Sequence, residues 1–175
     1  MRRALIVAAW LAVVLVGGLT SILGGAEAAE LRPGAWTVGG GLGFLSDTPD
    51  GTAFSLNLYG DYVVAERLSV GPLMQLGFTG DSGQLGLSGQ AKYWIDIPNT
   101  ARRLKLAVQG GIGFVHNSFR DEDTSWLIPL GFGADYALTD ALSVTGTFLL
   151  NFTDLHTGRG SGADVMPGLT FGLRF

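Results

Sequence analysis

The chain has 175 residues, with 15 acidic side chains against 11 basic ones and a formal net charge of −4. A chain with this acidic balance repels a phosphate backbone, so nucleic acid is excluded as an expected partner. It contains no cysteine, which excludes a disulfide framework and a thiolate metal site.

The first 28 residues have the features of a signal peptide. Two arginines at positions 2 and 3 precede an apolar run over residues 4–16, and the segment ends in Ala26-Glu27-Ala28. This small-x-small ending is typical of a signal-peptidase site, so cleavage is expected after Ala28. The alternative is an uncleaved anchor helix, because residues 4–25 are just long enough to span a bilayer. Cleavage leaves one domain over residues 29–175.

The rest of the chain alternates between apolar and polar residues with the period of a β-strand. Beyond residue 30 no stretch has 18 uninterrupted apolar residues, which excludes a membrane-spanning helix there. Eight period-two segments recur instead, each bounded by turn residues. They cover residues 35–45, 53–64, 68–79, 84–95, 103–115, 126–137, 142–153 and 164–175. Each is about the length that a tilted strand needs to cross a bilayer.

The two faces of these segments differ in chemistry. In the second segment Phe54, Leu56 and Leu58 lie on one face, whereas Ser55 and Asn57 lie on the other. The apolar faces carry no charge, and an outward lysine or arginine at the bilayer midplane would cost about 2–4 kcal/mol. The polar faces hold many of the 28 glycines, which suit a narrow lumen better than an exposed strand face. We therefore predict an all-β, eight-stranded, antiparallel up-and-down transmembrane β-barrel rather than a soluble barrel with an apolar interior.

The last segment is the strand that closes the barrel. Residues 165–175 alternate apolar with small or polar side chains and stop on an aromatic, so this strand must pair with the first one to satisfy its backbone. Aromatic residues also gather near the two ends of the segments, as in the interfacial girdles of membrane barrels. One girdle is expected to contain Trp36, Tyr62, Tyr93, Trp94, Tyr136 and Phe175; the other Phe44, Phe54, Phe78, Phe114, Trp126 and Phe152.

An internal repeat supports the strand count. Asp61, Tyr62, Leu68, Ser69 and Val70 recur 74 residues later as an identical set, followed by a shared Leu, Phe and Thr. The repeat indicates either duplicated hairpins or the shared constraints of one barrel.

These features resemble the small outer-membrane barrels of Gram-negative bacteria, the OmpX/OmpW-like and generic outer-membrane β-barrel domain families. The ending Gly172-Leu173-Arg174-Phe175 resembles their assembly signal, in which Phe171, Leu173 and Phe175 would be the apolar positions. The resemblance implies an outer-membrane location, contact with lipid and lipopolysaccharide, and transient partners in the barrel-assembly machinery and periplasmic chaperones. It also implies short periplasmic turns beside both termini and four longer connections outside. It leaves the oligomeric state open.

Some barrels of this kind are lipid A deacylases or palmitoyltransferases, so the histidines matter. His116 and Ser118 have a His-x-Ser spacing like that of the deacylase pair, with Glu122 nearby to orient the base. A second candidate set is Asp154, His156 and Ser161. A nucleophile needs a rigid mounting and a base within reach, which glycine-rich loops seldom supply. We therefore expect no enzymatic activity.

No cofactor or metal site is expected either. The acidic segments 47–51 and 120–123 lack the ordered ligand spacing of a calcium loop. No helix follows the glycine runs at 39–43 and 110–113, so neither provides a helix N-terminus for phosphate.

Five charges fall on the inward face, in the half of the barrel nearest the termini: Asp61, Lys92, Lys105, Asp135 and Arg174. Because side chains fill most of an eight-stranded interior and confined charges must pair or be hydrated, these residues predict a polar plug of ion pairs. Arg174 is expected to point towards Asp61 or Asp135. The sequence thus favours a non-enzymatic barrel with a plugged lumen and four outward loops, serving membrane integrity or surface interaction. The alternatives are a narrow channel or carrier for small solutes and a lipid A-modifying hydrolase.

Overall fold

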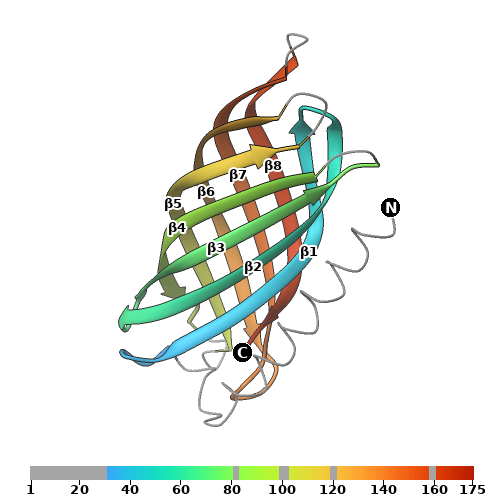
Figure 1. The fold of residues 1–175 in the computed structure, drawn as a ribbon. Coiled ribbons are helices and arrows are strands. Elements are labelled where there is room, and N and C mark those ends of the chain that lie inside the picture. Colours follow the sequence, from blue (N-terminus) through green and yellow to red (C-terminus); the bar gives the residue numbers. More distant parts are fainter. Residues whose placement is uncertain (1–30, 81–82, 99–102, 119–121, 158–160) are drawn as a thin grey trace, which may run out of the picture.

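The computed structural model describes residues 31–80, 83–98, 103–118, 122–157 and 161–175, which form a closed barrel. The described chain contains eight strands joined in sequence order (Figure 1). These are β1 (Trp36–Thr48), β2 (Gly51–Ala65), β3 (Leu68–Phe78), β4 (Gly83–Asp96), β5 (Leu104–Asn117), β6 (Asp123–Ala137), β7 (Ser143–Thr157) and β8 (Ser161–Arg174). Every neighbouring pair is antiparallel, as predicted. No helix within these described ranges is long and apolar enough to cross a membrane.

The barrel closes where the last strand meets the first. β8 pairs with β1 in a register that places Phe171 opposite Leu42. Beyond the end of β8, the N–H of Phe175 donates to the carbonyl of Val38 at 2.8 Å, and the N–H of Val38 donates back at 3.1 Å. Closure therefore gives the edges of both strands hydrogen-bond partners, which an open sheet would leave exposed. We call the end that holds Trp36 and Phe175 the terminal end, and the opposite end the distal end.

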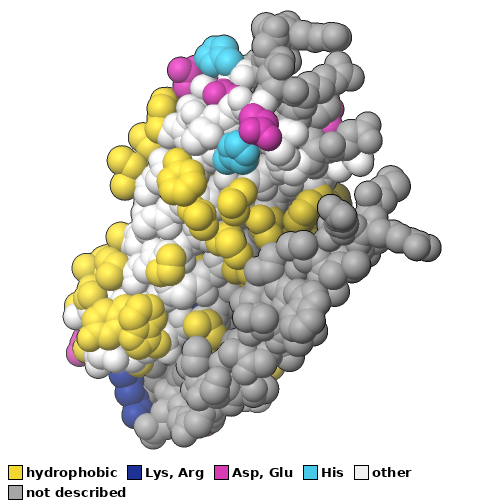
Figure 2. All heavy atoms as spheres, viewed as in Figure 1, with side chains coloured by type: hydrophobic (Ala, Val, Ile, Leu, Met, Phe, Trp, Pro, Cys, Tyr) yellow, Lys and Arg dark blue, Asp and Glu magenta, His cyan; other side chains and the backbone are white. Residues whose placement is uncertain are grey.

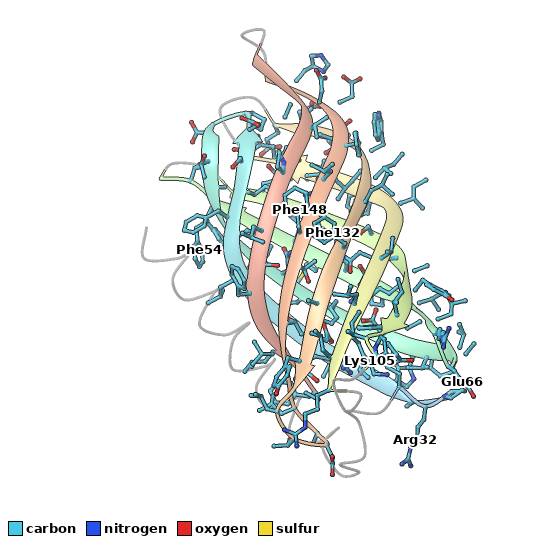
Figure 3. The ribbon with its side chains drawn as sticks, turned by 180° about the vertical axis from the view of Figure 1, so that it is seen from behind. Arg32, Phe54, Glu66, Lys105, Phe132 and Phe148 are labelled. Atoms are coloured by element: carbon cyan, nitrogen blue, oxygen red, sulfur yellow. The ribbon has the colours of Figure 1, made fainter. Side chains whose placement is uncertain are left out.

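The outer wall is apolar. Ile112 and Phe171 are 71% and 64% exposed, and the alternation that predicted an outward apolar face places both of them outside. Hydrophobic side chains cover much of the wall seen in Figure 2, and Phe54, Phe132 and Phe148 lie on the outer side of the barrel in Figure 3. Large apolar groups spread over this much of a surface need an apolar environment.

One girdle prediction is wrong. Trp94 is only 3% exposed, and its indole N–H donates to Ser69 Oγ at 3.0 Å inside the barrel. The reason is the period of the strand: Tyr93 points outward and is 49% exposed, so the next residue must point inward. Two consecutive aromatic residues of one strand therefore point to opposite faces, and only one of them can belong to the outer girdle.

The expectation of longer connections away from the termini is also wrong. The connections at the distal end cover residues 49–50, 79–82, 118–122 and 158–160, and those at the terminal end cover 66–67, 97–103 and 138–142. Several strands run further towards the distal end than predicted; β1 and β2, for example, stay paired as far as Thr48 and Gly51. The tight turn between them uses positive φ values at Asp47 (54°) and Gly51 (92°), conformations that asparagine, aspartate and glycine tolerate best.

Candidate functional site

The barrel interior is the candidate functional site, and most of its polar groups lie in the middle and the terminal half. The inward faces supply buried polar side chains from every strand, including Asn57, Gln75, Gln90, Gln109, Thr145, Asn151 and Thr170. These residues come from the polar faces of the alternating pattern. The strands thus turn the sequence alternation into an interior of amides and hydroxyls.

The first interior ion pair joins β4 to β2. Lys92 Nζ lies 2.7 Å from Asp61 Oδ2, with the side chains 6% and 0% exposed. Gln90 Nε2 donates to the other carboxylate oxygen of Asp61 at 3.3 Å. The Lys92 ammonium also lies 3.6 Å from the ring centroid of Tyr59, which is a cation–π distance. The buried lysine therefore has both a counter-charge and an aromatic face.

The second interior ion pair joins β8 to β6. Arg174 Nε donates to Asp135 Oδ2 at 2.5 Å, and Arg174 Nη2 donates to Ser143 Oγ at 3.3 Å. The guanidinium lies 5.3 Å from the ring of Trp94. Arg174 therefore selects Asp135 from the two expected partners. Several partners stabilise a buried charge, because each one offsets part of the free-energy cost of removing that charge from water.

Lys105 lies elsewhere. Its ammonium pairs with Asp96 Oδ1 at 2.9 Å, and the Asp96 side chain is 41% exposed. Figure 3 shows Lys105 towards the terminal end of the barrel, in the same region as Glu66 and Arg32. Lys105 is therefore a rim residue, and the buried pairs involve the other four predicted charges.

The internal repeat corresponds to two equivalent places in the barrel. Asp61 and Ser69 on β2 and β3 hold Lys92 and Trp94, whereas Asp135 and Ser143 on β6 and β7 hold Arg174. Each unit thus contributes one carboxylate for a cation and one serine oxygen that accepts a side-chain N–H. The repeated residues are those that hold the interior charges.

Buried apolar clusters, which we call the terminal and distal layers, lie towards the two ends of the interior. Leu31, Val63, Trp94 and Ala107 form a buried cluster at the terminal end, where Gly34 N–H donates to the carbonyl of Val63 at 2.8 Å. The distal layer is larger and consists of Leu45, Ala53, Val115, Leu127, Leu155, Ala163 and Met166. Between the layers lies an internal cavity of about 10 Å³, the space of one water molecule. Side chains therefore fill the barrel interior and form a packed core, as in other eight-stranded barrels.

In the first candidate set, the histidine and the serine bond to different partners. His116 Nδ1 lies 2.8 Å from Thr124 Oγ1, whereas Ser118 Oγ donates to the carbonyl of Gly83 at 2.9 Å. Glu122 is an exposed side chain just before β6.

The second set is also at the distal end. His156 Nδ1 lies 3.3 Å from Asp154 Oδ1, and both side chains are more than half exposed. The His156 N–H donates to Asp123 Oδ2 at 2.7 Å. Ser161 begins β8, and its side chain lies outside the described part of the chain. Across the described residues no group of three histidine or acidic side chains is placed to hold a metal ion.

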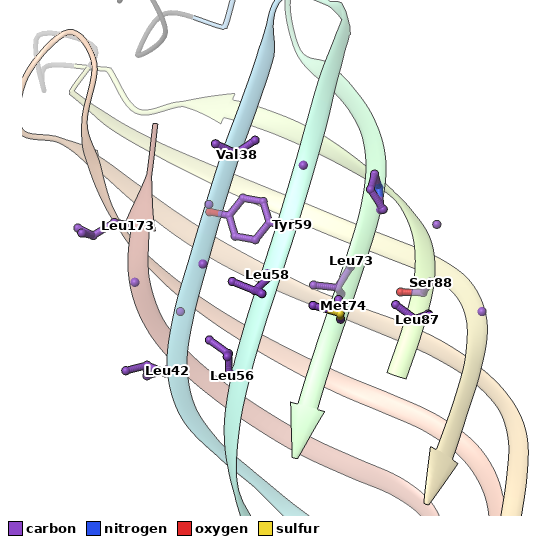
Figure 4. Close-up of a pocket in the computed structure, with 18 of the residues that line it drawn as sticks. Val38, Leu42, Leu56, Leu58, Tyr59, Leu73, Met74, Leu87, Ser88 and Leu173 are labelled. Atoms are coloured by element: carbon purple, nitrogen blue, oxygen red, sulfur yellow. The ribbon is translucent and has the colours of Figure 1, made fainter. Parts of the chain in front are cut away.

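The outer wall carries an apolar groove over β1–β5 and β8. Val38, Leu58, Met74, Leu87 and Leu173 are among its lining residues (Figure 4). These side chains belong to the outer face, so acyl chains of a surrounding bilayer would contact them. The groove also reaches inward-facing residues, because Tyr59 and Leu73 line both the groove and the internal cavity.

Sequence reasoning missed several interior residues. Tyr59 contacts Lys92, Leu31 covers the terminal end, and Leu127 belongs to the distal layer. The parity of β2 contained the signal for Tyr59, because Asn57 and Asp61 flank it on the inward face. Leu31 precedes the first strand, so no alternation could place it.

An apolar outer wall around paired charges defines the class of the molecule as a small barrel of the outer-membrane type. Its fold is similar to Neisserial surface protein A, with a TM-score of 0.59 and 16% identity over 79% of this chain and 94% of that one. The N-terminal β-barrel domain of Pseudomonas aeruginosa OprF gives a TM-score of 0.54 and 14% identity over 79% and 97% of the two chains. The outer membrane protein OprG from Pseudomonas aeruginosa gives a TM-score of 0.53 and 12% identity over 82% of this chain and 97% of that one.

No family model matches the chain, and no curated protein matches it in sequence. The likeness to solved structures is therefore one of fold, and it confirms the predicted closed eight-stranded barrel, a fold that these small outer-membrane proteins share.

Proposed function

We propose that the chain is a non-enzymatic protein of the bacterial outer membrane, with a plugged interior, that supports membrane integrity or surface interaction. The observation that carries the proposal is an interior filled by two buried ion pairs, Asp61–Lys92 and Asp135–Arg174, together with buried apolar clusters towards both ends. A solute path would have to disrupt an apolar layer and separate paired charges. Such an interior favours a rigid body over a conduit.

The distal rim is the surface that we assign to outside partners. The acidic side chains of the described distal end are Asp47, Asp50, Glu122, Asp123, Asp154 and Asp164. Acidic groups and both histidines are visible at the upper end of the molecule in Figure 2. This proposal places the termini on the periplasmic side, follows export by cleavage after Ala28, and includes lipopolysaccharide and the barrel-assembly machinery as partners. Phe171, Leu173 and Phe175 would then be read by that machinery during assembly.

Planar-bilayer recording tests the plug. Purified, refolded protein should give no large, steady conductance, because buried apolar clusters and paired charges fill the interior. The double variant Asp135→Ala/Arg174→Ala should also stay silent, since it leaves both layers intact. An open porin reconstituted in the same lipid serves as the positive control. Steady diffusive conductance from the unaltered protein would contradict the proposal and favour a channel.

Mass spectrometry of lipid A tests the non-enzymatic assignment. Expression of the folded protein should leave lipid A masses unchanged, because His116 and Ser118 bond to different partners and a nucleophile needs its base within hydrogen-bond reach. The matched comparison is the variant His116→Ala/His156→Ala at equal expression. A lipid A species that appears with the unaltered protein and disappears with the variant would establish a hydrolase or transferase.

A further inference from the structure

The internal cavity of about 10 Å³ lies beside the Asp61–Lys92 ion pair. Its lining includes Asn57, Tyr59, Gln90, Lys92 and Thr145. Gln90 is 5% exposed, and its Oε1 atom has no hydrogen-bond partner among the described residues. A buried acceptor of this kind calls for a donor, because desolvation without a hydrogen bond is unfavourable.

The orientation of the Gln90 amide is fixed by its neighbour. Gln90 Nε2 donates to Asp61 Oδ1 at 3.3 Å. Rotating the amide by half a turn would bring its carbonyl oxygen against a carboxylate oxygen, so two acceptors would face each other. The amide oxygen must therefore find its donor elsewhere.

Lys92 supplies the second half of the site. Its ammonium has three N–H groups, and its described contacts are Asp61 Oδ2 at 2.7 Å and the ring of Tyr59 at 3.6 Å. Gln90 and Lys92 bind the two oxygens of a single carboxylate, and both residues line the cavity. A third N–H of Lys92 is thus available to an acceptor in the cavity.

These requirements define the ligand. It must donate to Gln90 Oε1 and accept from Lys92 Nζ, and it must fit a cavity of about 10 Å³. The ammonium repels a cation, and the amide oxygen repels an anion. We propose that the cavity binds one water molecule that bridges Gln90 and Lys92. This water gives both buried groups a further partner, and the apolar layers on either side slow its exchange with bulk solvent.

A crystal structure that resolves ordered waters tests the site, with Gln90→Leu as the disrupting variant and Gln75→Leu as its control. Gln75 is also buried, at 6% exposure, but does not line the cavity. Density within about 2.7–3.2 Å of both Gln90 Oε1 and Lys92 Nζ is expected in the unaltered protein. It should be lost in Gln90→Leu and kept in Gln75→Leu. Heat-modifiable gel mobility checks that each variant is folded.

Magnetic relaxation dispersion of the water signal provides a second readout in solution. The number of long-lived internal waters should fall by about one in Gln90→Leu and stay constant in Gln75→Leu, following the one-water capacity of the cavity. The proposal is overturned if the unaltered protein shows no density at this place, or if Gln90 Oε1 bonds directly to a protein donor. Equal loss in both variants would also overturn it. The unaltered structure decides the matter even if Gln90→Leu does not fold.

Discussion

Replacing Asp135 with leucine should lower the free energy of unfolding by about 3–5 kcal/mol, because it leaves the guanidinium of Arg174 buried without its counter-charge. Arg174 is 2% exposed, and its described acceptors are Asp135 and Ser143. Only the hydroxyl oxygen of Ser143 would remain as a described acceptor, which is a poor replacement for a carboxylate. The measurement is the urea midpoint of refolded protein in detergent or vesicles, followed by gel mobility.

Two further variants separate this effect from a general loss of stability. Asp96→Asn breaks the rim pair with Lys105, in which the Asp96 side chain is 41% exposed. It should cost at most about 1 kcal/mol, the usual value for exposed pairs. The double variant Asp135→Leu/Arg174→Met should recover most of the stability lost by Asp135→Leu, because apolar groups can replace a buried pair without leaving a charge behind. Equal costs for Asp96→Asn and Asp135→Leu would show that the buried pair has no special role.

The strands and their faces were predictable from sequence because a period of two fixes them together. Phe54 and Asn57 need only their parity to be assigned to the wall and to the interior. The girdle prediction is wrong for Trp94 because it relies on the nearness of Trp94 to the end of its strand, whereas the alternation of side chains along β4 turns Trp94 inward. The strand ends were predicted too short at the distal end, because paired backbone can continue through polar residues such as Asp123 and His156, which carry no apolar alternation.

The partner of Arg174 could not be chosen from the pattern. Arg174 pairs in register with Gly39 on β1 and with Ser143 on β7. Gly39 in turn pairs with Tyr59, two residues from Asp61, and Ser143 pairs with Ala137, two residues from Asp135. An aspartate therefore lies at a similar distance on each side of Arg174. The ring of Tyr59 fills the space over Gly39, where an added Cβ would come within 2.4 Å of it. Asp61 already binds Lys92 on that side. Side-chain packing across the barrel, which alternation does not encode, makes the choice.

The internal repeat is also explained by contacts across the barrel interior. Positions 74 residues apart are four strands apart, so they occupy opposite sides of a barrel of eight described strands. Asp61 and Asp135 each neutralise one cation, and Ser69 and Ser143 each accept an N–H from a large neighbour. Common barrel constraints are enough to account for outward residues such as Tyr62 and Tyr136. The buried aspartates are different, because a carboxylate in this interior is tolerated only where a cation meets it.

Placing a charge on the outer wall should have the second large effect. Ile112→Arg should cost about 2–4 kcal/mol of folding free energy in lipid vesicles, because Ile112 is 71% exposed and the wall around it is apolar. The matched control is Thr124→Arg, on the same outer face at the distal end, where the neighbouring described groups include His116 and Asp123. Near a bilayer interface the cost of arginine falls to about 0–1 kcal/mol.

The comparison between these two variants tests which solvent the wall meets. Refolding into vesicles and measuring the urea midpoint of each variant should give a clear drop for Ile112→Arg and little change for Thr124→Arg. In a water-soluble barrel both positions would be solvent-exposed, and an exposed arginine would change stability by only about 0.5 kcal/mol at either one. Similar midpoints for the two variants in vesicles would therefore contradict a lipid-facing wall. A selective loss at Ile112 would place the middle of β5 in the hydrocarbon core, with the interior charges Asp61, Lys92, Asp135 and Arg174 screened from lipid by the strands themselves.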